Sequence, residues 1–257
     1  MKNILHRTLF ISILLIFVSI NAKAIEIDSL FEQGNAMFNA SNYAEAIDKY
    51  ETLIDSGYKS DELYYNLGNS YYRMGEIASA ILNYERALVL KPSNENAQYN
   101  LHLANTKIVD IIGEVQQPFF EKWEENISKQ LSSNLWSVIN YILLLLALVC
   151  TMIFIMTRRV SVRRIFFLLG LLALVLMGVS INMSFEQARS RLDNPYSIVM
   201  SQRVQVKSSP SSTSSNLFII HEGLKVKIVD KVGEWYEIQL SDGNQGWVSS
   251  SEVERIF

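Results

Sequence analysis

The sequence predicts a multi-domain protein that joins an all-α solenoid of helical repeats, a hairpin of two transmembrane helices and a C-terminal all-β barrel. Three observations support this prediction. Residues of similar type recur with a period of 34 between residues 27 and 112, two uncharged apolar runs follow, and short β-rich runs separated by turn residues fill the chain after residue 196. A chain of 257 residues has room for one or two larger domains. The bunching of its apolar residues favours several smaller parts instead.

Residues 1–24 have the pattern of a secretory signal peptide. A basic start at Lys2 and Arg7 precedes an apolar stretch of 13 residues, Thr8–Ile20, and Ala22-Lys23-Ala24 provides a cleavage site of small residues. The stretch is too short for a membrane span, which needs about 20 apolar residues. The alternative is an uncleaved N-terminal anchor. Under both interpretations the chain that follows is exported.

Two further runs, Leu135–Met156 and Ile165–Met183, are long enough to cross a membrane. They contain no charged residue over 22 and 19 positions, and helices of these lengths reach about 33 and 28 Å against a hydrocarbon core of roughly 30 Å. Neither run contains an ionisable side chain of the kind that marks an ion or proton path, so a transporter is not indicated.

The loop 157–164 between the two runs fixes the expected orientation. Such a loop stays in the cytoplasm when it is rich in arginine. The arginines are Arg158, Arg159, Arg163 and Arg164. Two crossings return the chain to its starting side, so residues 25–134 and 184–257 are both expected on the periplasmic face of a bacterial inner membrane.

The 34-residue period resembles the tetratricopeptide repeat (TPR). The recurring pairs are Gly34 and Gly68, Ala46 and Ala80, and Tyr50 and Tyr84. The resemblance implies a TPR domain over 25–113, with repeats at 27–60 and 61–94 and a capping helix at 94–112 that covers the end of the stack. The second repeat also has the terminal Pro92 of the pattern.

In this resemblance the first helix of each repeat lines a concave groove. The residues expected to bind a partner there are Asn35, Phe38, Tyr65, Asn66, Asn69, Tyr72, Arg73, Tyr99 and Asn100. Asn amides both donate and accept hydrogen bonds, and Tyr rings supply flat apolar contact. An extended peptide is therefore the expected ligand. TPR modules that grip a C-terminal carboxylate carry a Lys where this chain has Phe31. The alternative is that the Asn side chains only satisfy polar groups between repeats.

Residues 114–134 are expected to form a juxtamembrane amphipathic helix. Phe119, Phe120, Trp123, Ile127 and Leu131 recur at helical spacing with charged residues between them. A helix of this type rests on a membrane surface and would hold the groove close to the bilayer.

After a charged linker at 184–196, residues 197–257 resemble a bacterial SH3 domain. The matching elements are Val204-Gln205-Val206, Gly223, Val226, Trp235, Asp242-Gly243 and Gly246-Trp247-Val248. This order implies a small SH3-like barrel. We expect Trp247 in its core and Trp235 or Tyr236 on a ligand face. The alternative is that both Trp side chains only pack the barrel.

Composition and motifs argue against catalysis and nucleic-acid binding. Residues 25–135 carry 17 carboxylates against 8 Lys and Arg, and an acidic module does not attract phosphate backbones. The single cysteine, Cys150, allows neither an internal disulfide nor a thiolate metal cluster. The sequence contains no phosphate-binding loop, G-x-S-x-G or H-E-x-x-H. We therefore expect no enzyme, no metal and no cofactor.

The order of these parts over the whole chain resembles the BatE-type proteins, the TPR component of the bacterial aerotolerance (Bat) systems. The resemblance implies partners rather than chemistry, namely membrane-bound von Willebrand A-domain Bat proteins and a MoxR-type ATPase, with envelope stress tolerance as the theme. The expected function is a non-enzymatic scaffold. The alternatives are a peptidoglycan-binding tether or sensor that acts through the barrel, and a regulatory subunit of an envelope enzyme.

Overall fold

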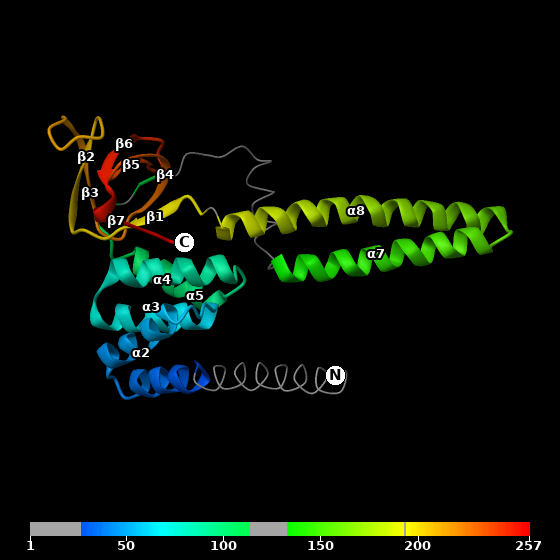
Figure 1. Ribbon diagram of the computed structural model, residues 1–257, viewed down its shortest axis with the longest axis horizontal. Helices are drawn as coiled ribbons and strands as arrows, with labels where there is room; N and C mark the ends of the chain where they lie inside the picture. The colour runs from blue at the N-terminus through cyan, green and yellow to red at the C-terminus, as the bar shows by residue number, and fades with distance from the viewer. Residues whose placement is uncertain (1–26, 111, 114–132, 193) are drawn as a thin grey trace, which may run out of the picture.

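The computed structural model describes residues 27–110, 112–113, 133–192 and 194–257 (Figure 1). The predicted signal peptide at 1–24 lies outside these ranges, and so does the predicted amphipathic helix except for its last two residues. The described chain forms three parts: N-terminal TPR helices, a long hairpin of two apolar helices and a C-terminal antiparallel sheet. The predicted fold class is confirmed.

Five consecutive helices form the TPR domain. They are the helix of residues 27–39, α2 (Tyr43–Asp55), α3 (Asp61–Met74), α4 (Ile77–Leu90) and α5 (Glu95–Asn105). Local signals set the ends of α3: the Ser60 side chain accepts a hydrogen bond from the backbone N–H of Leu63, and Gly75 ends the helix at φ 85°. Asn94 caps α5 in the same way as Ser60 caps α3.

The 34-residue period places the same close contact in both repeats. A Cβ atom added to Gly34 would lie 2.5 Å from the Tyr50 ring, and one added to Gly68 would lie 2.7 Å from the Tyr84 ring. Such separations are far below van der Waals contact, so each tyrosine packs directly on the glycine backbone. The glycines are therefore required by the helix packing that the repeat pattern predicts.

The capping helix is shorter than predicted. It ends at Asn105 rather than at residue 112. The segment that follows contacts other parts of the molecule: Ile108 joins the apolar cluster around α4, and Ile112 packs against the barrel core. We infer that contacts of Ile108 and Ile112 with the apolar clusters replace the helical conformation that the repeat pattern predicts for this segment.

The hairpin consists of α7 (Ser133–Met156) and α8 (Val160–Leu192). Both contain apolar stretches long enough to cross a membrane, over Leu135–Met156 and Val160–Phe185. Ala147 and Cys150 on α7 and Ala173 on α8 are buried. A Cβ atom added to Gly170 would lie 3.4 Å from that of Cys150, so the two helices approach closely where their side chains are small.

The turn between the two helices is shorter than the predicted loop 157–164. The loop spans residues 157–159 only, because Arg163 and Arg164 already belong to α8. The Arg163 guanidinium lies 4.6 Å from the centroid of the Phe154 ring on α7, a cation–π contact that ties the ends of the two helices together.

Most of the segment 184–196, predicted as a charged linker, belongs to regular structure, because α8 continues through Leu192 and β1 begins at Tyr196. The junction is fixed to the barrel. The Asn194 side chain accepts from the backbone N–H of Tyr196 at 2.9 Å, and the Arg255 guanidinium donates to the Asn194 carbonyl at 3.0 Å. The backbone N–H of Ile228 donates to the carbonyl of Pro195 at 2.6 Å.

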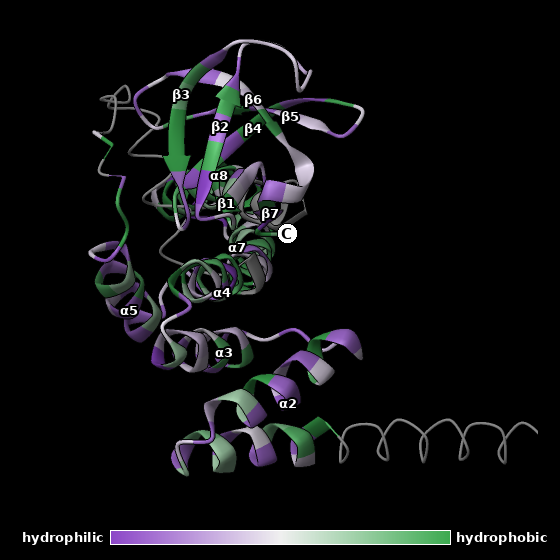
Figure 2. Cartoon of the chain, turned by 90° about the vertical axis from the view of Figure 1, so that its left-hand side faces the viewer, coloured by the Kyte–Doolittle hydropathy of each residue, from purple (hydrophilic) through white to green (hydrophobic). Residues whose placement is uncertain are grey.

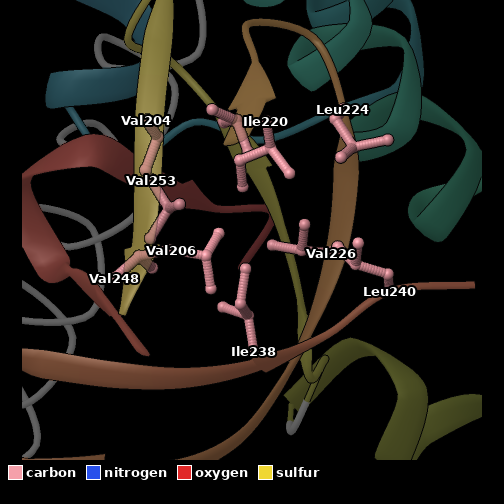
Figure 3. Packing of buried hydrophobic residues seen from close by; sticks show 10 residues of the cluster. Val204, Val206, Ile220, Leu224, Val226, Ile238, Leu240, Val248 and Val253 are labelled. Carbon is pink, nitrogen blue, oxygen red and sulfur yellow. The ribbon is translucent and has the colours of Figure 1, made fainter. Parts of the chain in front are cut away.

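The C-terminal domain is a seven-stranded antiparallel sheet in the order β3-β2-β6-β5-β4-β1-β7. The strands are β1 (Tyr196–Val199), β2 (Arg203–Lys207), β3 (Asn216–His221), β4 (Lys225–Val232), β5 (Trp235–Gln239), β6 (Gln245–Ser249) and β7 (Val253–Arg255). Figure 3 shows buried side chains from these strands and from the turn before β4 pointing toward one another in the core; they include Val204, Val206, Ile220, Leu224, Val226, Ile238 and Val248. The sequence did not predict β1.

The barrel packs against α4, which lies between it and α3 (Figures 1 and 2). Ile198 of β1 and Ile256 beyond β7 share one buried apolar cluster with Ile81 and Leu82 of α4. The last residue, Phe257, meets the Tyr64 ring of α3 edge-on, with ring centroids 5.7 Å apart. The TPR domain and the barrel thus share a core.

Polar contacts surround this shared core. The Arg86 guanidinium of α4 donates to the carbonyls of Arg255 and Ile256 at 3.1 and 2.9 Å and to the Glu254 carboxylate at 2.8 Å. Lys225 of β4 pairs with Glu85 at 2.7 Å. Asp110 accepts from the backbone N–H of His221 at 2.6 Å and contacts its ring at 2.9 Å.

Candidate peptide-binding groove

A pocket of about 200 Å³ lies among the helix of residues 27–39, α3, α4 and α5 of the TPR domain. It is lined by Phe38, Asn69, Tyr72, Arg73, Tyr84, Asn100 and Leu103. Five of these were predicted as groove residues. Tyr84 and Leu103 were not, because Tyr84 belongs to the second helix of its repeat and Leu103 lies one turn beyond Tyr99 and Asn100. The repeat pattern does place a tyrosine at this position in both repeats, as Tyr50 and Tyr84. The period could therefore have predicted Tyr84 as a groove residue.

The other predicted groove residues lie outside this pocket. Asn35 and Asn66 bond to each other one repeat away, and Tyr65 packs its ring 6.2 Å from that of Tyr84. Tyr99 is 69% exposed. The structure therefore gathers only part of the predicted set at one point, next to the second repeat.

The Asn side chains form a hydrogen-bond network that repeats with the 34-residue period. In the first repeat, the Oδ1 atom of Asn35 accepts from the Tyr50 hydroxyl at 2.8 Å and from Asn66 Nδ2 at 3.0 Å. In the second, the Oδ1 atom of Asn69 accepts from the Tyr84 hydroxyl at 2.8 Å and from Asn100 Nδ2 at 2.7 Å. Each network joins both helices of one repeat to the next first helix, so these Asn residues hold the stack together, as the alternative interpretation expected.

Burial keeps the two tyrosine hydroxyls protonated as donors. It raises the pKa of Tyr50 to about 12, and the nearby Glu32 carboxylate adds to this effect. Burial also raises the pKa of Tyr84 well above its ordinary value. A phenol that stays neutral keeps its O–H group and can donate a hydrogen bond to an Asn Oδ1 atom. The network therefore holds one orientation of the Asn69 amide over the physiological pH range.

Arg73 is placed at the pocket by an aromatic platform. Its guanidinium carbon lies 4.7 Å from the centroid of the Tyr43 ring, and Tyr43 in turn packs edge-on against Phe38 with centroids 5.4 Å apart. Among the residues that the structure describes, no carboxylate forms a salt bridge with Arg73. The cation is therefore oriented by rings and remains open to a ligand.

The predicted ligand face of the barrel is divided between two sides of the sheet. Tyr236 packs against the barrel core, and Lys231 lies 5.4 Å over its ring. Trp235 is its neighbour along β5 and points to the opposite, outer side. A ligand role of Trp235 and Tyr236 stays a prediction.

The expectation that Trp247 lies in the barrel core is wrong. Gly246 and Val248 on either side of it are buried, and Trp247 itself is half-buried on the outer side of β6. A Cβ atom added to Gly246 would lie 2.4 Å from Val206. The glycine therefore has to face inward, and strand alternation turns Trp247 outward. Its place across from Glu237 puts it diagonally next to Trp235.

Within the described ranges, no group of three or more His, Cys, Asp or Glu side chains is arranged to hold a metal ion. The three buried side-chain oxygens without a hydrogen-bond partner there are Oδ1 of Asn83, Oδ1 of Asn140 and Oγ of Ser197. They lie on three different elements and do not converge on a site.

Comparisons with known proteins agree with this architecture. Residues 28–57 match the model of the tetratricopeptide repeat, residues 68–108 match a TPR repeat model, and residues 203–254 match the bacterial SH3 domain. The chain thus combines TPR repeats with a C-terminal bacterial SH3 domain, and two long apolar helices lie between them. TPR repeats of this kind mediate interactions with other proteins.

Two curated relatives share similarity with part of the chain. Sperm-associated antigen 1 of Rattus norvegicus is 30% identical over 90 residues, which are 35% of this chain and 10% of that protein. The same antigen of Mus musculus is 33% identical over 76 residues, or 30% of this chain and 8% of that protein. The chain spans about a tenth or less of these relatives.

Proposed function

We propose that this protein is a non-enzymatic, membrane-anchored adaptor whose TPR groove binds an extended peptide segment of an envelope protein. The pocket beside Asn69 supports this proposal most directly. It combines apolar walls at Phe38, Tyr72 and Leu103 with the Arg73 guanidinium, which Tyr43 orients and with which no carboxylate of the described residues pairs. This combination suits a peptide, which offers apolar side chains and polar backbone or charged groups together.

In this proposal α7 and α8 cross the membrane with the arginines of residues 158–164 in the cytoplasm, and both soluble domains face the extracytoplasmic side. The arginine-rich turn supports this orientation. The shared core supports the placement of both domains in one compartment, because Arg86 and Ile256 could not touch across a bilayer. The predicted signal peptide at 1–24 supports export.

The order of TPR domain, hairpin and SH3-like barrel supports a place in a Bat-type envelope stress or aerotolerance complex. The partner would then be a membrane-bound von Willebrand A-domain protein of the same system. The chain would present its groove to an extended segment of that partner at the membrane surface.

Site-specific photo-crosslinking tests the groove. A photoreactive phenylalanine analogue replaces Tyr72 in the pocket or, as the control, Asp48 on the exposed side of α2. Irradiation of intact cells should give a discrete adduct from position 72 and none from position 48. Identical adducts from both positions, or none from either, would discard the groove as the binding surface. Tyr72 is preferable to Asn69 because Asn69 also joins the repeats.

A second candidate function is a peptidoglycan-binding tether that acts through the barrel. The half-buried Trp235 and Trp247 on one outer side of the sheet favour it, because flat aromatic surfaces bind sugar rings and short peptides. The full chain in detergent should sediment with purified sacculi, and Trp235→Ala should reduce the bound fraction several-fold. Equal sedimentation of both forms would remove this candidate.

A further inference from the structure

We propose that the pocket at the second repeat binds a carboxylate of the partner peptide, held by the Asn69 amide and the Arg73 guanidinium. The inference rests on the proposed groove function and adds the chemistry that the groove selects. It differs from the Lys-based carboxylate capture at the first repeat, where this chain has Phe31.

The Asn69 amide presents a donor because its acceptor is already used. Its Oδ1 atom accepts two hydrogen bonds, from Tyr84 and from Asn100. Two lone pairs are all that an amide oxygen offers. Its Nδ2 group has no hydrogen-bond acceptor among the residues that the structure describes, although Asn69 lines the pocket. A ligand at this point has to bring an acceptor.

Arg73 adds a positive charge to this donor. It is the charged residue among the seven that line the pocket, and Tyr43 holds its guanidinium at 4.7 Å. A guanidinium fixed by an aromatic ring loses little freedom when it binds a planar anion. The lining of one pocket thus offers both an amide N–H and a guanidinium, which is a donor set that a carboxylate satisfies.

Within α3, the acidic residues lie far from this local positive charge. The acidic residues of α3 lie at its first turn, at Asp61 and Glu62, whereas Arg73 lies in its last turn. Eleven helical residues separate Glu62 from Arg73, which is roughly 16 Å along the axis. This exceeds the screening length of about 8 Å at physiological ionic strength. Glu76, which precedes α4, is nearer to Arg73 in the chain, but it does not line the pocket and forms no salt bridge with Arg73 among the described residues. Arg73 therefore sets the charge of the pocket lining.

The first repeat provides an internal comparison. It has the same network of Tyr50, Asn35 and Asn66. The residue 34 positions before Arg73, however, is Asn39, which carries no charge. The network alone therefore serves the stacking of helices in both repeats, and the added cation makes the second repeat selective for a carboxylate.

The apolar wall predicts the residue next to the carboxylate. Phe38, Tyr72 and Leu103 line the pocket beside the donors. The preferred peptide would carry a large apolar residue adjacent to its acidic group, so that the ring and aliphatic surfaces are covered while the anion is bound.

Peptide binding to the full chain in detergent micelles tests the inference. The probes are three fluorescent octapeptides of the same leucine-rich sequence. One has a central Glu and an amidated C-terminus, one has Gln and a free C-terminal carboxylate, and one has Gln and an amidated C-terminus. At least one carboxylate peptide should bind ten-fold or more tightly than the uncharged peptide. The peptide that does so shows whether a side chain or the chain end supplies the carboxylate.

Variants then assign the effect to Arg73. Arg73→Gln should remove the preference, Arg73→Lys should keep part of it, and Lys49→Gln on α2 should leave it unchanged. Because Arg73 is exposed, the thermal midpoint of each variant should match that of the parent chain. Equal binding of all three peptides, or no binding of any, would overturn the inference. If a crosslink from position 72 persists in that case, the adaptor function stands without the carboxylate preference.

Discussion

Helices α2 and α4 occupy the same position in successive repeats, yet they meet different surroundings. The side of α2 that faces away from α3 is polar and exposed, with Asp48 and Thr52. At the positions 34 residues later, α4 has Leu82, which is 2% exposed, and Arg86, which binds the C-terminal backbone of the barrel. The same repeat pattern thus has two outcomes: the outer side of α2 is exposed, and that of α4 joins the TPR helices to the barrel.

The difference shows how a two-repeat solenoid is stabilised at its end. Stacks of so few repeats leave apolar surface uncovered and are near the lower limit of stability. Here the barrel covers α4, with Ile198, Ile256 and Phe257 in contact with the TPR helices. We infer that the SH3-like domain contributes to TPR stability directly, in addition to any ligand that it binds.

The largest effect is expected from exchanging the paired residues of α2 and α4. Leu82→Asp should destabilise the full chain by about 4 kcal/mol or more, because it removes a buried side chain and places a carboxylate in an apolar cluster. The reverse exchange, Asp48→Leu, should change stability by less than about 0.5 kcal/mol. Thermal unfolding in detergent measures both. Similar midpoints for the two variants would contradict the asymmetry between the helices.

Removing the hydrogen bonds that Arg86 donates to residues 254–256 should have the next largest effect on stability. Arg86→Ala loses three hydrogen bonds to residues 254–256, and the expected loss is about 2 kcal/mol. Thr52→Ala at the matching position of α2 should cost less than about 0.5 kcal/mol. In limited proteolysis, the Arg86→Ala variant should be cleaved faster than the parent chain in the segment that follows α5. An unchanged cleavage rate would show that the Arg86 hydrogen bonds do not hold the domains together.

A smaller and equal effect in the two repeats is expected at alkaline pH. The pKa of Tyr50 is raised to about 12 by burial and by Glu32, and the pKa of Tyr84 is raised by burial. Both folded-state values lie above the ordinary value near 10, so their stabilisation is complete below pH 10 and is lost above it.

Each tyrosine should therefore lower stability by about 1 kcal/mol between pH 10 and 11. Tyr50→Phe and Tyr84→Phe should each reduce this fall by a similar amount, as followed by denaturant unfolding in detergent. A fall that begins below pH 9, or that neither variant reduces, would contradict the roles assigned to the two phenols.

The helices and strands of this molecule could be predicted because their signals are local and periodic. The glycines at positions 34 and 68 mark the close approach of Tyr50 and Tyr84 at the predicted spacing. The uncharged run Leu135–Met156 agrees with a helix of the structure. The groove was predicted in part, since the repeat positions gave Asn69, Tyr72 and Arg73 but not which of them share a pocket.

Contacts between domains could not be predicted, because no local pattern encodes them. The capping helix ends early and α8 runs on through Leu192, and both features depend on how the barrel sits. One signal was present in the sequence: α4 is apolar on nearly all sides, and such a helix is buried all round. In the strand segment Gly246-Trp247-Val248, side-chain alternation alone allowed either Trp247 or its two neighbours to face the core. The close approach of Val206 to Gly246 turns Gly246 and Val248 inward and Trp247 outward.

The shared core of the TPR helices and the barrel predicts that these two domains form one rigid body. Spin labels at Asp48→Cys on α2 and Gln205→Cys on β2, both exposed, test it in a Cys150→Ala background. Pulsed electron paramagnetic resonance on the full chain in lipid nanodiscs should give one narrow distance distribution, and Leu82→Asp should broaden it. A broad distribution in the parent chain would contradict the claim, because it would mean that the two domains move independently.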